Sequence, residues 1–138
     1  MTKTTKKYVI FILQLIIAIS YLQTLRFKFT AHPDSVYIFS QLNLEPYGRI
    51  GIGIFELIIA ILILIPKTKI IAGMLSIAVI TGAIVSHLGP LGVEVQNDNG
   101  ILFYFALFVL ASTLLFLWLQ KEEVKLMFTT LKHKLIKS

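Results

Sequence analysis

Four apolar stretches dominate the sequence and restrict the chain to a membrane environment. They run over Tyr8–Leu25, Ile50–Ile65, Ile70–Leu88 and Ile101–Leu119. Each is close to the roughly 20 residues that a helix needs to cross about 30 Å of hydrocarbon. A segment in lipid must satisfy its backbone hydrogen bonds internally, and the alternating pattern of a membrane β-barrel is not seen. We therefore predict an all-α integral membrane protein with four spanning helices in one bundle.

The composition excludes several other classes of protein. Of the 138 residues, 57% are hydrophobic and 14% are charged, whereas globular domains are just under half apolar and about a quarter charged. A disordered chain is excluded by the same numbers. The sequence contains no cysteine. This excludes a thiol catalyst, a disulfide-stapled fold and a zinc or iron–sulfur site held by cysteines.

The lysine and arginine residues are distributed unevenly around the four stretches. Ten lysines lie before the first stretch, between the second and third, and after the fourth. The opposite side has only Arg26, Lys28 and Arg49. Because basic residues collect on the cytoplasmic side, we predict that both termini are cytoplasmic. The membrane topology accounts for the net charge of +6, so we expect no nucleic-acid partner.

The chain divides into a membrane part, residues 1–120, and a tail, residues 121–138. Apolar residues of the tail recur at helical spacing among lysines, at Val124, Met127, Phe128, Leu131 and Leu135. This pattern predicts a basic amphipathic helix on the anionic cytoplasmic leaflet. On the other side of the membrane, Ser35–Leu42 is predicted to form a short helix on the membrane surface.

The start of the chain has a competing interpretation as a cleaved signal peptide. Lys6 and Lys7 precede an apolar core that reaches Ala18-Ile19-Ser20, which loosely resembles such a peptide. The apolar run continues to Leu25, however, and this continuity favours a retained membrane span.

Glu56 is an acid in the middle of the second apolar stretch. A carboxylate in hydrocarbon is costly unless it is paired, protonated or facing a wet cavity, and such groups are candidates for function. The alternative is an acid that only ties helices together. Arg49 lies seven residues earlier, on the same helix face and about 10 Å away. Both side chains are therefore predicted to line one groove.

Polar residues also form a stripe along the first span. Gln14, Tyr21 and Lys28 are spaced by seven residues, so they share one helix face. We expect Gln14 to make an interhelical hydrogen bond. Lys28 lies level with the outer end of the second span, where it is predicted to pair with Glu56 and keep the carboxylate ionised. The alternative for Lys28 is an exposed interfacial lysine.

His87 ends the third span at the same outer level. A histidine can exchange protons near neutral pH or hydrogen-bond a quinone carbonyl. A metal site made from His87, His32 and Glu56 lacks characteristic ligand spacing, and we predict none. Ala78, Gly82 and Ser86, spaced by four, are expected to let a neighbouring helix approach closely.

Three motifs occur in the order and spacing typical of one protein family. They are Leu25-Arg26-Phe27-Lys28-Phe29, Phe55-Glu56-Leu57-Ile58 and Gly82-Ala83-Ile84-Val85-Ser86-His87-Leu88. The chain resembles, over most of residues 8–119, the DoxX-like family of small bacterial four-helix membrane proteins. The resemblance implies a compact bundle in the cytoplasmic membrane, with Lys28, Glu56 and His87 as polar signature positions. The chain departs from the family at Thr24-Leu25, where members often have a small residue before the basic one.

The resemblance also implies a function, because the family's namesake resembles a subunit of a thiosulfate:quinone oxidoreductase. We expect an accessory subunit of a quinone- or redox-linked system rather than an enzyme acting alone. Glu56 and His87 would relay protons in an outward-facing pocket, and Lys28, Arg49 and Tyr21 would contact the ligand. Quinone is the candidate cofactor, and a redox protein and a second copy of the chain are the expected protein partners. The alternatives are a non-catalytic assembly or anchoring subunit and a small proton-coupled transporter.

Overall fold

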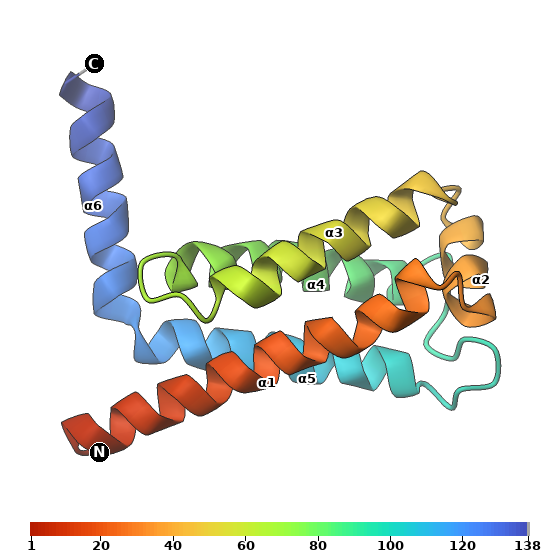
Figure 1. The fold of residues 1–138 in the computed structure, drawn as a ribbon, viewed down its shortest axis with the longest axis horizontal. Helices are drawn as coiled ribbons and strands as arrows, with labels where there is room; N and C mark the ends of the chain where they lie inside the picture. Colours follow the sequence, from red (N-terminus) through yellow and green to blue (C-terminus); the bar gives the residue numbers. More distant parts are fainter. Residues whose placement is uncertain (138) are drawn as a thin grey trace.

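The computed structural model describes residues 1–137, and all of the regular secondary structure in that range is helical. Figure 1 shows the order and arrangement of its elements. The helices are α1 (Lys3–Phe29), α2 (Pro33–Gln41), α3 (Tyr47–Leu62), α4 (Lys69–Leu88), α5 (Ile101–Leu119) and α6 (Lys121–Lys137).

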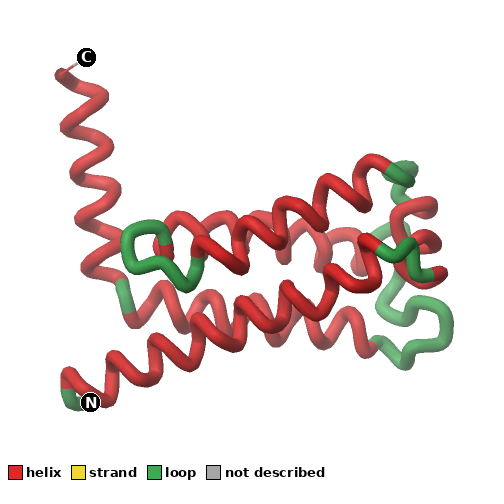
Figure 2. Tube along the Cα trace, viewed as in Figure 1, coloured by secondary structure: helices red, strands yellow, loops and turns green. Residues whose placement is uncertain are grey.

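Four of the helices pack side by side, as Figures 1 and 2 show. Helix α1 packs on α3 and α5, and α4 packs on the same two helices. The core between them contains Leu13, Ile17 and Tyr21 of α1 with Ile59 of α3 and Phe116 of α5. The α1 residues are spaced by four, which places them on one face of the helix. Helix α2 covers one end, in contact with α1 and α3.

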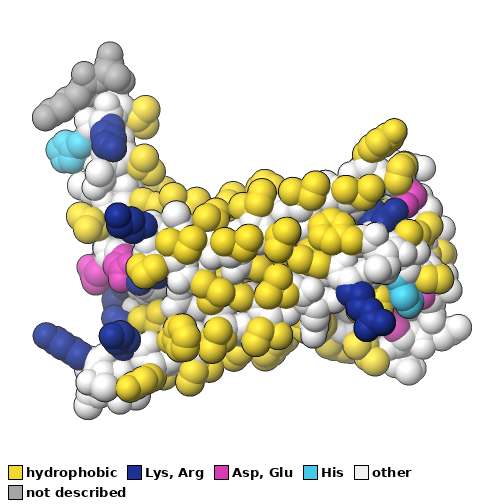
Figure 3. Space-filling model, in the orientation of Figure 1, with side chains coloured by type: hydrophobic (Ala, Val, Ile, Leu, Met, Phe, Trp, Pro, Cys, Tyr) yellow, Lys and Arg dark blue, Asp and Glu magenta, His cyan; other side chains and the backbone are white. Residues whose placement is uncertain are grey.

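The outer surface of these four helices is also apolar (Figure 3). Large side chains such as Ile19, Ile58 and Leu114 are exposed on it. A continuous apolar surface of this kind is unfavourable in water and matches hydrocarbon. Helices α1, α4 and α5 are each long and apolar enough to cross a bilayer. The chain is therefore a multi-pass membrane protein with three candidate spans.

The second predicted span has the expected length but lies three residues nearer the N-terminus, at Tyr47–Leu62 instead of Ile50–Ile65. Helix α3 has 16 residues and is about 24 Å long, less than the roughly 30 Å of hydrocarbon. It ends at Leu62, whereas the prediction extended to Ile65. Pro66 ends the helix, because it has no N–H to donate to the Leu62 carbonyl four residues earlier and disfavours helical backbone at Ile65. The Thr68 hydroxyl then donates to the Leu62 carbonyl over 2.8 Å and satisfies one of the last acceptors of α3.

The first helix is longer than the apolar stretch that predicted it. It begins at Lys3, where the Thr2 side chain accepts a hydrogen bond from the Thr5 backbone over 3.1 Å. It continues to Phe29, so that Lys28 lies in its last turn. The short surface helix is Pro33–Gln41, close to the predicted Ser35–Leu42. The predicted tail helix forms α6, which runs across the long axis of the other helices (Figure 1).

The glycine that permits close helix packing is not in the predicted row of small residues. Ala78 and Gly82 are exposed, and a Cβ atom added at Gly82 would have no neighbour within 4 Å. The predicted role of this row in packing within the chain is therefore wrong. At Gly73, an added Cβ would lie 2.9 Å from Leu117 and 3.2 Å from the Phe116 ring. A close contact between α4 and α5 is therefore made at Gly73, one turn from the N-terminal end of α4.

Replacing Gly73 by Val is expected to destabilise the protein by about 1–3 kcal/mol, because Phe116 is fully buried and cannot move away without strain. The free energy of unfolding in detergent measures the effect. Gly82→Val is the matched control on the same helix and is expected to be tolerated. Equal losses in the two variants would contradict this account of the α4–α5 contact.

Candidate functional site

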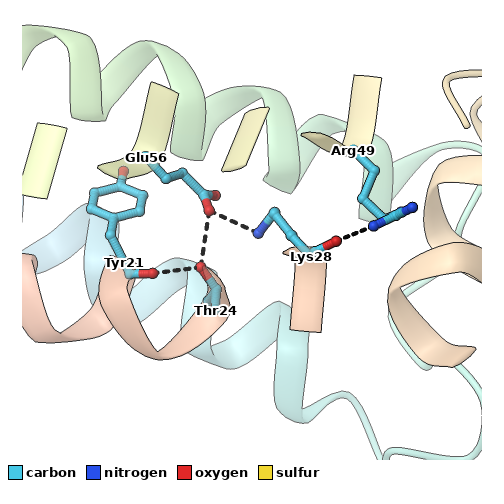
Figure 4. A network of polar contacts seen from close by, with 5 residues as sticks. All are labelled: Tyr21, Thr24, Lys28, Arg49 and Glu56. Atoms are coloured by element: carbon cyan, nitrogen blue, oxygen red, sulfur yellow. Dashed lines mark hydrogen bonds and ion pairs between the residues drawn. The ribbon is translucent and has the colours of Figure 1, made fainter. Parts of the chain in front are cut away.

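The structure contains the ion pair between Lys28 and Glu56, and Figure 4 shows its surroundings. Lys28 Nζ lies 2.8 Å from Glu56 Oε2, and the two side chains are 13% and 8% exposed. A helical side chain leans toward the N-terminus of its helix. Lys28, in the last turn of α1, therefore reaches back to the level of Glu56 on α3.

Thr24 is a further contact of Glu56 that the sequence prediction missed. Its hydroxyl lies 2.9 Å from Glu56 Oε2 and 2.8 Å from the Tyr21 carbonyl oxygen. Thr24 precedes Lys28 by one helical turn, and this spacing was a signal that both would face one partner. Within the described part of the chain, Glu56 Oε2 accepts the bonds from Thr24 and from Lys28, and Oε1 accepts none. Thr24 thus helps to hold the buried acid.

Arg49 makes a second ion pair close by, with a partner that was also missed. Its Nε lies 2.8 Å from Oε1 and 2.9 Å from Oε2 of Glu45. The spacing of four residues between Glu45 and Arg49 was the available signal. Arg49 also donates from Nη1 to the Lys28 carbonyl oxygen, so it caps the C-terminal end of α1. Its charge is therefore already paired, and it positions the backbone that carries Lys28.

The other two polar residues of the α1 stripe connect helices. Tyr21 is 3% exposed, and its hydroxyl lies 2.8 Å from the Ser76 hydroxyl on α4. Ser76 in turn lies 3.1 Å from Thr113 Oγ1 on α5. Gln14 donates to the carbonyl of Ile63 at the end of α3. The predicted interhelical bond of Gln14 is therefore present. Along the stripe, Gln14 bonds to the end of α3 and Tyr21 bonds to α4.

His87 is buried at the end of α4, and its contacts are not with the Lys28–Glu56 pair. Its Nδ1 lies 3.0 Å from the Gly92 carbonyl oxygen, and its ring meets Phe103 edge to face with centroids 5.8 Å apart. Because a carbonyl can only accept, this bond places a proton on Nδ1. The hydrogen bond ties the 89–100 loop to the end of α4, and the ring contact joins that end to α5; neither contact is with the Lys28–Glu56 pair. Among residues 1–137, no group of three or more His, Asp or Glu side chains is placed to hold a metal ion.

Asp98 organises the same loop. Its carboxylate accepts backbone N–H bonds from Val95, Gly100 and Leu102 at 2.8–3.0 Å. Burial by itself would raise the pKa of Asp98. The N–H bonds from Leu102, Val95 and Gly100, with the nearby His87, outweigh that effect and lower the pKa below its ordinary value. The ionised form therefore caps the N-terminal end of α5.

Asp98→Ala is expected to lower stability by about 1 kcal/mol, the usual loss for a removed helix cap. Because the pKa of Asp98 is lower in the folded state, its contribution is present above the unfolded-state pKa and is lost as the pH falls through the folded pKa. Thermal unfolding measured from neutral to acidic pH should therefore show a smaller acid-induced loss for Asp98→Ala. Parallel curves for the two proteins would contradict this role.

The Lys28–Glu56 pair offers donor and acceptor groups side by side. The ammonium of Lys28 has N–H donors beyond the one directed at Glu56, and Glu56 Oε1 is an unused acceptor. The pair joins Lys28, in the last turn of α1, to Glu56, near the middle of α3 (Figure 4). Such a pair can hold a carbonyl- or hydroxyl-bearing head group and exchange a proton with it.

Comparison with known proteins agrees with this description. The model of the DoxX-like family matches residues 12–116, which include α2, α3, α4 and most of α1 and α5. No curated protein and no solved structure matches the chain significantly. Because the matched region covers most of the sequence and contains the Lys28–Glu56 pair, the chain belongs to the DoxX-like family of membrane proteins.

Proposed function

We propose that this protein is the membrane subunit of a quinone-linked redox system, in which the Lys28–Glu56 pair binds the polar head group of a quinone. The observation that carries the proposal is the burial of this ion pair with hydrogen-bonding capacity to spare. Intramembrane ion pairs are costly, and they commonly mark ligand or proton pathways. The apolar surroundings of the pair suit the ring and tail of a lipid-soluble cofactor.

The proposal includes a topology with four crossings. Helix α3, although short, lies beside α1 and α4 along its length (Figures 1 and 2), and we take it as the fourth crossing. The start of α1 and helix α6 lie at one end of the molecule (Figure 1), which is the end rich in lysine. With that end in the cytoplasm of a bacterial cell, the Lys28–Glu56 pair lies toward the outer face of the cytoplasmic membrane.

Each residue has a role that follows from its chemistry. Lys28 donates a hydrogen bond to a quinone carbonyl. Glu56 takes up a proton from outside and passes it to the oxygen that becomes a hydroxyl on reduction. The electrons come from a redox partner protein. His87, at the same end, exchanges protons with the outside. Tyr21 lines the inner side of the site, while Arg49 fixes the backbone of Lys28.

A purely structural role is the second candidate, because the same bonds fasten two helices. The Lys28–Glu56 pair, the Thr24–Glu56 bond and the Arg49 bond to the Lys28 carbonyl all join α1 to α3. An assembly or anchoring subunit would need these contacts for its fold alone.

Mass spectrometry of the gently purified protein separates the two candidates. The double variant Lys28→Met, Glu56→Leu replaces the buried pair by apolar groups, which is often neutral or stabilising for a fold. We expect quinone to co-purify with the native protein and with the control Glu94→Gln, which removes an exposed acid. We expect it to be lost from the double variant while the variant remains folded. Equal quinone content in all three proteins would contradict the proposal.

A further inference from the structure

Helix α6 presents an unpartnered amphipathic surface at the lysine-rich end of the molecule. It runs across the long axis of the four packed helices (Figure 1). In the proposed topology those helices cross the membrane along that axis, which places α6 parallel to the membrane plane. Lys69 Nζ holds it in this position, 3.0 Å from both carboxylate oxygens of Glu123.

The apolar side of α6 is turned toward the four packed helices. Figure 3 shows apolar side chains on the side of α6 that faces the four-helix body. Leu126 is 67% exposed and Leu131 is 49% exposed, although both are large apolar residues. An interfacial helix buries such a face between lipid headgroups and acyl chains, with its polar face in water.

A groove lies in the angle between α6 and the turn before α4. We call it the elbow groove. Its volume is about 340 Å³, and it is lined by Pro66, Lys67, Ile70, Glu123, Leu126, Met127, Thr130 and Leu131. Its walls are mostly apolar, whereas Lys67 is an exposed cation at its edge. An apolar trough beside a cation matches an acyl chain attached to a phosphate.

The charge of this end favours an anionic lipid over a neutral one. Lysines of the N-terminal turn of α1, of the 66–69 turn and of α6 gather here: Lys3, Lys6, Lys7, Lys67, Lys69, Lys121, Lys125, Lys132 and Lys134. The acids that face them are Glu122 and Glu123, which pair with Lys125 and Lys69. The excess of positive charge attracts the anionic surface of the inner leaflet.

We propose that α6 and the elbow groove form a binding site for an anionic phospholipid of the cytoplasmic leaflet. Its phosphate contacts Lys67, and an acyl chain lies against Ile70, Leu126 and Leu131. The site is at the opposite end of the molecule from the Lys28–Glu56 pair, so it does not depend on quinone binding there.

Native mass spectrometry of the full-length protein with added phosphatidylglycerol or phosphatidylcholine tests the site. Lys67→Gln is expected to weaken phosphatidylglycerol binding about fivefold, the usual effect of one juxtamembrane lysine. Phosphatidylcholine binding should not change. Lys3→Gln is the matched control, because Lys3 is exposed at the same end but does not line the groove. Equal affinity for the two lipids, or equal effects of the two variants, would overturn the proposal.

A fluorescence measurement tests the position of α6 without depending on affinity. Trp118 is the single tryptophan, so Trp118→Phe with Leu126→Trp places one reporter in the groove. In vesicles we expect stronger quenching by brominated phosphatidylglycerol than by brominated phosphatidylcholine, and the difference should shrink in high salt. Equal quenching by the two lipids would show a helix without preference for anionic lipid. A tryptophan that is not quenched by lipid, and is shielded only when another protein binds, would show a protein-docking surface. Either of these two results rejects the lipid-binding site.

Discussion

Glu56→Gln is expected to lower quinone-linked electron transfer in membranes by at least about 100-fold, the usual contribution of a positioned proton-transfer group. The amide has nearly the same shape as the acid and still accepts hydrogen bonds from Lys28 and Thr24. It can neither hold the negative charge nor deliver a proton to a quinone oxygen. The rate of quinone reduction in membrane vesicles, at matched protein levels, measures this effect.

Two further variants make this result specific to the buried acid. Glu56→Asp keeps a proton-exchanging carboxyl but shortens the reach to the ligand, so an intermediate rate is expected. Glu94→Gln removes an exposed acid and should leave the rate unchanged. A Glu56→Gln variant that accumulates normally and retains the native rate would reject the proton-transfer role.

Lys28→Met is expected to destabilise the protein by about 3 kcal/mol, because it leaves the carboxylate of Glu56 buried without its partner charge. Adding Glu56→Leu to this variant should restore most of the lost stability, since an apolar pair needs no compensation. The free energy of unfolding in detergent, monitored by circular dichroism, is measured for the single and double variants as a double-mutant cycle.

The exposed ion pair of α6 provides the control for this cycle. Lys125 and Glu122 are both 71% exposed, and surface pairs of this kind contribute only about 0–1 kcal/mol. Lys125→Met should therefore have little effect on unfolding. If Lys28→Met and Lys125→Met cost the same, the buried pair contributes no more than a surface contact and does not fasten α1 to α3.

The membrane character, the helices and the candidate acid were all predictable from local pattern. Apolar run length predicted α1, α4 and α5, because a helix must satisfy its own backbone bonds in lipid. Helical spacing predicted that Gln14, Tyr21 and Lys28 share a face. The cost of a charge in hydrocarbon identified Glu56 and led to Lys28 as its counter-charge. Glu45 and Thr24 had usable spacing signals as well, four residues from Arg49 and Lys28.

Other features depended on which helix faces touch, and the local pattern does not contain that information. The row at Ala78 and Gly82 has the same small residues as a packing face, yet Gly73 makes the contact with α5. His87 lies in the last turn of α4, but its hydrogen bond and ring contact are with Gly92 and Phe103. In a membrane helix both the lipid-facing and the buried sides are apolar, so hydrophobicity does not distinguish them. Only the packed structure determines which polar side chains meet, because each hydrogen bond depends on the rotation of two helices at once.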